Sequence, residues 1–153
     1  MNNISWYRCF INIINIDLLS EYENLNLKNK IEKRVKAQNS IQYKIDKYTL
    51  KNNGEIPINK CLNDIYGTRI ILNKEIEYDL IKKFVEKKFP KIKCIDASKG
   101  EYKAIHLYFR TDNYSFPWEL QIWNITDEKN NKESHKKYKQ EYTKWEQEIK
   151  KGE

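Results

Sequence analysis

Three segments in the second half of the chain alternate apolar and polar residues with a period of two. They cover residues 91–96, 102–110 and 117–123. This alternation is typical of strands, because successive side chains of a strand point to opposite faces of a sheet. An amphipathic helix, EIEYDLIKKFVEKKF, is predicted over residues 75–89, and Pro90 ends it. The chain is therefore expected to build a sheet with helices packed against it.

Further segments complete the expected order of elements. We predict an N-terminal helix over residues 10–28, a strand over 31–37, a helix from about 40 to 50, a strand over 65–72 and a C-terminal helix over 127–151. The order α, β, α, β, α, β, β, β, α predicts an α+β fold. We expect a mixed sheet of about five strands flanked by helices, rather than a doubly wound parallel sheet. All 153 residues are expected to form one domain.

The charge of the chain favours anionic partners. Lys and Arg number 29 against 22 Asp and Glu, so the net charge is +7. Such an excess is typical of proteins that bind nucleotides or RNA. The alternative is that the many lysines and asparagines reflect only an AT-rich genome.

Neither the cysteines nor the N-terminus points to an exported or membrane protein. The three cysteines Cys9, Cys61 and Cys94 are far apart and form no CxxC motif, so we expect reduced thiols and no metal bound by them. The apolar run at the start lacks a basic segment and is interrupted by polar residues, unlike a signal peptide or a membrane span. We expect a cytoplasmic protein with no membrane partner.

Two acidic residues stand at unusual places in the predicted strands. Asp64 comes directly before the strand over 65–72, and Glu119 lies inside the strand over 117–123. Trp118, Leu120 and Ile122 would share one face of this strand, and Glu119, Gln121 and Trp123 the other. The second face is polar and aromatic, which suits the floor of a site. If the two strands are neighbours, Asp64 and Glu119 can share a Mg²⁺ ion. The alternative is that each acid simply faces solvent at an edge of the sheet.

Basic residues cluster before and after Asp64. Arg34 and Lys36 are two residues apart in a predicted strand, Lys44 follows in the next helix, and Arg69 lies five residues after Asp64. Converging cations beside a metal are how phosphoryl-transfer enzymes neutralise a triphosphate. The alternative is a solvated basic strand edge. There is no GxxxxGK[ST] sequence, so the chain has no P-loop.

A tyrosine and a histidine lie in the first half of the predicted strand over 102–110. Gly100 is predicted in a turn, and Tyr102 and His106 follow on one face of the strand. An aromatic side chain at such a junction can stack on a base, which contributes about 1–3 kcal/mol. Taken singly, Tyr102 is more often a half-buried strand tyrosine and His106 a structural histidine. His135 is followed one helical turn later by Tyr138 and Lys139. This spacing indicates only that these residues share one face of a helix.

Together, five short motifs resemble the synthetase domain of the RelA/SpoT family, the alarmone synthetases. They are R-x-K-x-x-x-S-x-x-x-K over residues 34–44, D-I-x-G-x-R-I over 64–70, Y-x-A-I-H over 102–106, E-x-Q-I over 119–122 and H-x-x-Y-K over 135–139. The resemblance runs from about residue 30 to about residue 140. It is specific because all five motifs occur in the family's order.

The resemblance implies an ATP pyrophosphokinase. Synthetase domains of this family transfer the β,γ-pyrophosphate of ATP to a ribose 3′-hydroxyl and release AMP. Carried over by motif, Asp64 and Glu119 would bind Mg²⁺, and Glu119 is also the candidate for activating the hydroxyl. The ATP phosphates would be held by Arg34, Lys36 and Lys44, with Ser40 beside them, and Arg69 would be a supporting phosphate or structural residue of the same ATP site. Tyr102 would stack on the acceptor base, in a pocket lined by His106 and Gln121.

The chain departs from the family pattern at two places. Glu101 stands where the family has a glycine before the stacking tyrosine, and Trp123-Asn124 replaces an Arg-Thr pair after E-x-Q-I. No hydrolase or regulatory domain is expected beside the synthetase, which is typical of a small alarmone synthetase. The segment after Lys139 is too short for the helices that form tetramers, so we expect a monomer.

The acceptor is left open between two classes. A toxic branch of the small synthetases modifies the 3′-CCA end of tRNA, whereas other members act on GDP or GTP. The small size, Trp123 and the charge of +7 favour tRNA, with Lys28, Lys30 and Lys33 as contacts to the acceptor stem and a protein antitoxin as a partner. A catalytically silent nucleotide- or RNA-binding domain is the third possibility, against which the paired acids speak.

Overall fold

The computed structural model describes residues 29–52, 55–110 and 112–149, so the predicted N-terminal helix over 10–28 and Lys28 lie outside the described residues. The strands are β1 (Lys30–Val35), β2 (Tyr66–Leu72), β3 (Lys93–Asp96), β4 (Ile105–Phe109) and β5 (Trp118–Asn124). The helices are α2 (Gln38–Asn52), α3 (Ile58–Cys61), α4 (Tyr78–Lys88), the 3-10 helix η1 (Ile125–Asp127) and α5 (Glu128–Ile149).

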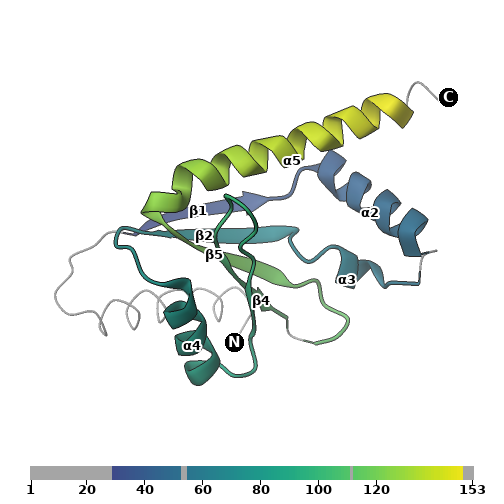
Figure 1. The fold of residues 1–153 in the computed structure, drawn as a ribbon. Coiled ribbons are helices and arrows are strands. Elements are labelled where there is room, and N and C mark those ends of the chain that lie inside the picture. The colour runs from purple at the N-terminus through teal and green to yellow at the C-terminus, as the bar shows by residue number, and fades with distance from the viewer. Residues whose placement is uncertain (1–28, 53–54, 111, 150–153) are drawn as a thin grey trace.

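The strands form one mixed sheet in the order β1-β2-β5-β4-β3. The central pair, β2 and β5, is parallel, and the other three pairs are antiparallel. Parallel neighbours need a long connection, and here α4, β3 and β4 all lie in the chain between β2 and β5. Helix α4 lies on one side of the sheet and α5 runs across the other (Figure 1). The predicted α+β fold with a five-stranded mixed sheet is confirmed.

The core fills the face of the sheet that α4 covers. Side chains at alternate positions of β2, β4 and β5 point to this face and pack against the apolar stripe of α4. The buried cluster consists of Ile70, Leu72, Ile76, Ile81, Phe84, Val85, Ile105, Leu107, Phe109, Leu120 and Ile122. The predicted division of β5, with Leu120 and Ile122 on one face and Glu119 on the other, is thereby confirmed.

Two elements begin later than the periodicity predicts, for the same physical reason. The side chain of Asn124 binds both backbone groups of Ile76, at 3.1 Å to its N–H and 2.9 Å to its carbonyl. The side chain of Asn131 binds Lys103 in the same way, with both distances 2.8 Å. These bonds occupy the backbone groups that a helix or a strand would use. Helix α4 therefore starts at Tyr78 and β4 at Ile105.

Two smaller findings complete the fold. The short helix α3 was not predicted; it forms one turn after Pro57, whose carbonyl accepts a hydrogen bond of 2.8 Å from the backbone N–H of Lys60. Across the described ranges, none of the helices has the length and apolar character that a membrane span requires.

Candidate active site

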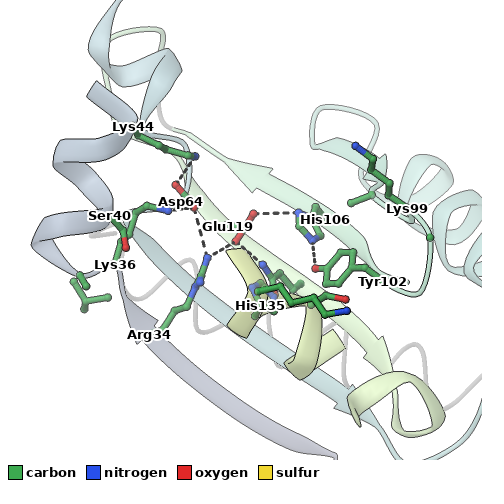
Figure 2. Close-up of a pocket in the computed structure, with 17 residues that line it drawn as sticks. Arg34, Lys36, Ser40, Lys44, Asp64, Lys99, Tyr102, His106, Glu119 and His135 are labelled. Carbon is green, nitrogen blue, oxygen red and sulfur yellow. Dashed lines mark hydrogen bonds and ion pairs between the residues drawn. The ribbon is translucent and has the colours of Figure 1, made fainter. Parts of the chain in front are cut away.

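The site lies on the polar face of the sheet, where matching positions of neighbouring strands form a straight row. Arg34 of β1 pairs with Gly67 of β2, Gly67 with Glu119 of β5, and Glu119 with Tyr108 of β4. Above this row is a cavity of about 850 Å³ between the sheet, α2 and α5 (Figure 2). The residues that line it include Arg34, Lys36, Ser40, Lys44, Asp64, Lys99, Tyr102, His106, Glu119, Gln121, His135 and Lys137.

Three cations surround Asp64 at one end of the cavity. Its carboxylate accepts from Lys36 Nζ at 2.6 Å and from Lys44 Nζ at 2.9 Å, and Arg34 Nη2 lies 3.6 Å away. Burial alone would raise the pKa of Asp64, but the charges of Lys44 and Lys36 hold it below its usual value. Burial lowers the pKa of Lys36, although Asp64 opposes the shift. The arrangement concentrates positive charge around one ionised acid.

Glu119 is almost completely buried at the centre of the row. Its Oε1 atom lies 3.1 Å from His106 Nδ1 and accepts from the Tyr108 hydroxyl at 3.2 Å. Its Oε2 atom accepts from Gln121 Nε2 at 2.8 Å and from Arg34 Nη2 at 3.4 Å. Burial would raise the pKa of Glu119, but the hydrogen bond from His106 and the charge of Arg34 keep it below its usual value. Glu119 is therefore ionised at neutral pH.

The two acids are placed to share one cation. A single atom, Arg34 Nη2, lies within ion-pair distance of both Asp64 and Glu119. Asp64 lies two residues before β2, and Glu119 lies in β5, the parallel neighbour of β2, as the Mg²⁺ prediction requires. Within the described ranges no group of three or more His, Cys, Asp or Glu side chains is arranged to hold a metal ion, so the candidate set is the two carboxylates. Mg²⁺ commonly takes one or two carboxylates and completes its shell with water and phosphates, and the pair fits this pattern.

Tyr102 and His106 form the other end of the cavity. The Tyr102 hydroxyl lies 2.7 Å from His106 Nε2, which links Tyr102 through the imidazole to Glu119 (Figure 2). Burial raises the pKa of Tyr102 to about 12, so its hydroxyl stays protonated. The loop that carries Tyr102 is fixed to α5 by the fully buried Asn131, which clamps the backbone of Lys103. Sequence analysis missed Asn131, because a polar residue in a charged helix gives no sign of burial.

Arg69 lies beneath the cavity, and its side chain is not among those that line it. Its guanidinium donates to Gln121 Oε1 at 3.1 and 3.2 Å and to Glu32 Oε2 at 3.0 Å. Its Cζ lies 3.5 Å from the ring centre of Trp123, which in turn stacks on His135 at 5.6 Å. Arg69 thus orients the Gln121 amide, whose nitrogen then faces Glu119. This geometry favours a supporting position over direct contact with ATP phosphates.

His135 closes the cavity from α5. Its ring meets the edge of Tyr102 at a centroid distance of 5.5 Å and lies 3.3 Å from Arg69 Nη2. Burial, with the nearby charges of Arg69 and Arg34, lowers the pKa of His135 to about 4. The imidazole is therefore neutral at physiological pH. In the sequence His135 showed only a helix face, and the fold brings that face over the sheet.

The lysines predicted to contact tRNA lie in different places. Lys30 is held by Glu128 at 2.7 Å and Glu32 at 3.0 Å, in a network that ties β1 to α5. Lys33 is paired with Thr68 of β2. Because side chains alternate along a strand, Lys33 points to the face of the sheet opposite Arg34 and the cavity. The cavity instead has two exposed lysines that sequence analysis did not single out, Lys99 and Lys137.

Comparison with known proteins identifies the fold and the family. The family described as a region found in RelA / SpoT proteins matches residues 33–143. No curated protein matched the sequence well enough to count as a relative. The small alarmone synthetase 1 of Bacillus subtilis has a similar structure, with a TM-score of 0.53, 19% identity and coverage of 92% of this chain and 78% of that one. A GTP pyrophosphokinase family protein from Streptococcus pneumoniae has a TM-score of 0.56, 16% identity and coverage of 87% and 70%.

These comparisons agree with the order of the motifs and with the site that the fold assembles from them. The match to the family covers most of the chain, and it includes Arg34, Asp64, Tyr102, Glu119 and His135. The predicted family is therefore confirmed. The chain belongs to the RelA/SpoT family, whose synthetase domains are ATP pyrophosphokinases.

Proposed function

We propose that this enzyme transfers the β,γ-pyrophosphate of ATP to the 3′-terminal ribose of tRNA. One observation carries the transfer itself: Arg34 Nη2 lies between Asp64 at 3.6 Å and Glu119 at 3.4 Å, beside two further cations. An ionised pair of acids next to converging cations suits Mg²⁺ and a triphosphate. The opposite end of the cavity, with Tyr102 and His106, suits a base and its ribose.

The proposed reaction gives each group a defined task. The 3′-oxygen of the acceptor attacks the β-phosphorus of ATP, and the bond from that phosphorus to the oxygen bridging the α- and β-phosphates breaks, so AMP leaves. Glu119 takes the proton of the 3′-hydroxyl. Arg34, Lys36 and Lys44 stabilise the charge on the phosphate oxygens. Mg²⁺ held by Asp64 and Glu119 would add to that neutralisation. Positioning of the two substrates supplies most of the remaining acceleration.

The tRNA acceptor is supported by charge around the cavity. The exposed Lys99 and Lys137 line the cavity beside Tyr102 and His135. The whole chain has a net charge of +7, which favours an RNA backbone. Lys28, Lys30 and Lys33 remain candidates for contacts farther along the acceptor stem, which requires Lys30 to exchange its acidic partners for phosphate.

GDP or GTP is the alternative acceptor. The small alarmone synthetase 1 of Bacillus subtilis has been solved bound to its product pppGpp, with a TM-score of 0.50, 20% identity and coverage of 92% of this chain and 86% of that one. The base site formed by Tyr102 fits a guanine as well as an adenine, because stacking is tolerant of the base. The acceptor itself therefore has to be tested.

The test uses ATP labelled at the γ-phosphate, with Mg²⁺ and separate samples of uncharged tRNA, GDP and GTP. We expect label on tRNA, and no label with the Glu119→Gln variant. Label on GDP or GTP alone would replace the tRNA assignment by alarmone synthesis. ATP binding without label on any acceptor would favour the silent binding domain.

A second test addresses the biological consequence. Loss of the free 3′-hydroxyl of tRNA blocks aminoacylation, so expression in growing bacteria is expected to stop growth. Asp64→Ala and Tyr102→Ala should relieve the arrest. Normal growth with the wild-type protein well expressed contradicts a toxin, and with it the proposed antitoxin partner.

A further inference from the structure

Tyr108 lies in the row of the site but in none of the five motifs. It pairs with Glu119 across β4 and β5 and with Lys93 across β4 and β3. Its side chain is half-buried, and it does not belong to the residues that line the cavity. It therefore contacts Glu119 without lining the cavity, and it is placed to act on the substrates through that acid.

The hydrogen bonds around Glu119 give Tyr108 a particular task. Its hydroxyl donates to Oε1 of Glu119 at 3.2 Å, and His106 Nδ1 lies 3.1 Å from the same oxygen. Tyr102 lies 2.7 Å from His106 Nε2, so a consistent set of donors runs from Tyr102 through His106 to Glu119. A carboxylate offers about two acceptor positions on each oxygen. Oε1 thus has two ring-bearing partners, His106 and Tyr108, that belong to the same strand, β4.

The other oxygen of Glu119 has different partners. Oε2 accepts from Gln121 at 2.8 Å and from Arg34 at 3.4 Å. The contact with Arg34 is longer than the one with Gln121, and the Arg34 side chain is 36% exposed. Arg34 can therefore turn away from Oε2 toward ATP phosphates. The acid can present that oxygen to the cavity only if its other oxygen is held in place.

We propose that Tyr108 is a positioning residue that fixes Oε1 of Glu119 and so directs Oε2 toward the acceptor. The inference rests on the proposed role of Glu119 as the base. Tyr108 remains a donor throughout the working pH range, because burial and the nearby Glu119 raise the pKa of its hydroxyl. Loss of the hydroxyl lets the carboxylate rotate, so that Oε2 is no longer held toward the acceptor.

The variant Tyr108→Phe removes the hydroxyl and keeps the ring. We expect kcat to fall about tenfold, since a hydrogen bond to a charged group is lost, while KM for ATP stays unchanged. Tyr114→Phe is the matched control, because Tyr114 is 91% exposed and lies outside the site.

A second readout does not depend on turnover. The orientation of the Glu119 carboxylate can be read from crystal structures of the substrate-free wild type and variants. We expect this carboxylate to rotate away from its wild-type position in Tyr108→Phe and to stay in place in Tyr114→Phe. An unmoved Glu119 carboxylate in Tyr108→Phe overturns the inference, whether or not the wild-type enzyme transfers pyrophosphate. A wild-type enzyme without transfer activity overturns the proposed function, and the orientation of Glu119 still decides the role of Tyr108.

Discussion

The side chain of Arg34 lies directly across Gly67 on its way to Glu119. A Cβ atom at position 67 would meet Arg34 Nε at 3.2 Å and Cγ at 3.3 Å, which is tighter than ordinary van der Waals contact. Because Arg34, Gly67 and Glu119 share one row of the sheet, the missing side chain opens the path that lets the guanidinium reach both acids. The glycine of the D-I-x-G-x-R-I motif thus has a steric role in this chain.

The variant Gly67→Ala is expected to displace Arg34 and weaken ATP binding. The loss of one charge-assisted contact predicts up to about a tenfold higher Kd for a non-hydrolysable ATP analogue with Mg²⁺, measured by calorimetry. Arg34→Ala should weaken binding at least as much. If Gly67 acts through Arg34, the double variant binds no worse than Arg34→Ala alone. Additive losses in the double variant would show that Gly67 acts by another route.

The buried amide of Asn131 is expected to control the acceptor end of the cavity. Asn131→Ala removes both bonds to Lys103 and frees the loop that carries Tyr102, so KM for the acceptor should rise while KM for ATP changes little. Two lost buried hydrogen bonds also predict a stability cost of about 2–3 kcal/mol. Asn124→Ala is the matched control, because Asn124 clamps Ile76 in the same way on the core side. An equal rise in acceptor KM for both variants would attribute the effect to general loosening.

Asp64 is expected to stabilise the cations that it binds, as well as to serve the reaction. Lys36 has a side chain only 8% exposed, so Asp64→Asn leaves a buried ammonium group without its anion. We expect the free energy of unfolding to fall by about 3 kcal/mol in urea titrations. Adding Lys36→Met should restore much of that loss, although activity stays absent. A double variant as unstable as Asp64→Asn would contradict this account.

The lowered pKa of His135 predicts that the free energy of unfolding depends on pH. Its folded pKa of about 4 lies below the ordinary value of 6.5, so the unfolded state takes up the proton first as the pH falls. The stabilising contribution is therefore fully present above pH 6.5 and is lost progressively between 6.5 and 4. The loss is at most about 3 kcal/mol. Urea unfolding at several pH values should show this slope in the wild type and a shallower one in His135→Asn, and equal slopes would contradict the assignment.

The sequence was informative where a single strand decides the geometry. Alternation in β5 put Glu119 on the face opposite Leu120. The same alternation places Tyr108 on the face of His106, although Tyr108 belongs to none of the motifs. The register between β4 and β5 could not be predicted from the sequence, because core packing and the connections between the strands determine it. It is this register that brings Tyr108 beside Glu119.

Contacts between distant segments were also out of reach. Asn124 and Asn131 clamp backbone groups 48 and 28 residues away and set where α4 and β4 begin, although each is an ordinary polar residue in the sequence. The position of His135 depends on how α5 crosses the sheet (Figure 1). Arg69, predicted at the ATP phosphates, lies beneath the cavity because Gln121, Glu32 and Trp123 hold it there.

The most direct test of the central claim is the chemical state of the tRNA 3′ end after reaction. Uncharged tRNA is incubated with the enzyme, ATP and Mg²⁺, digested with nuclease, and the terminal nucleoside is analysed by mass spectrometry. The account predicts a terminal adenosine that carries a 3′-diphosphate, formed in equal amount to AMP and absent with Glu119→Gln. An unmodified terminal adenosine, with the same enzyme converting GDP or GTP, would contradict it.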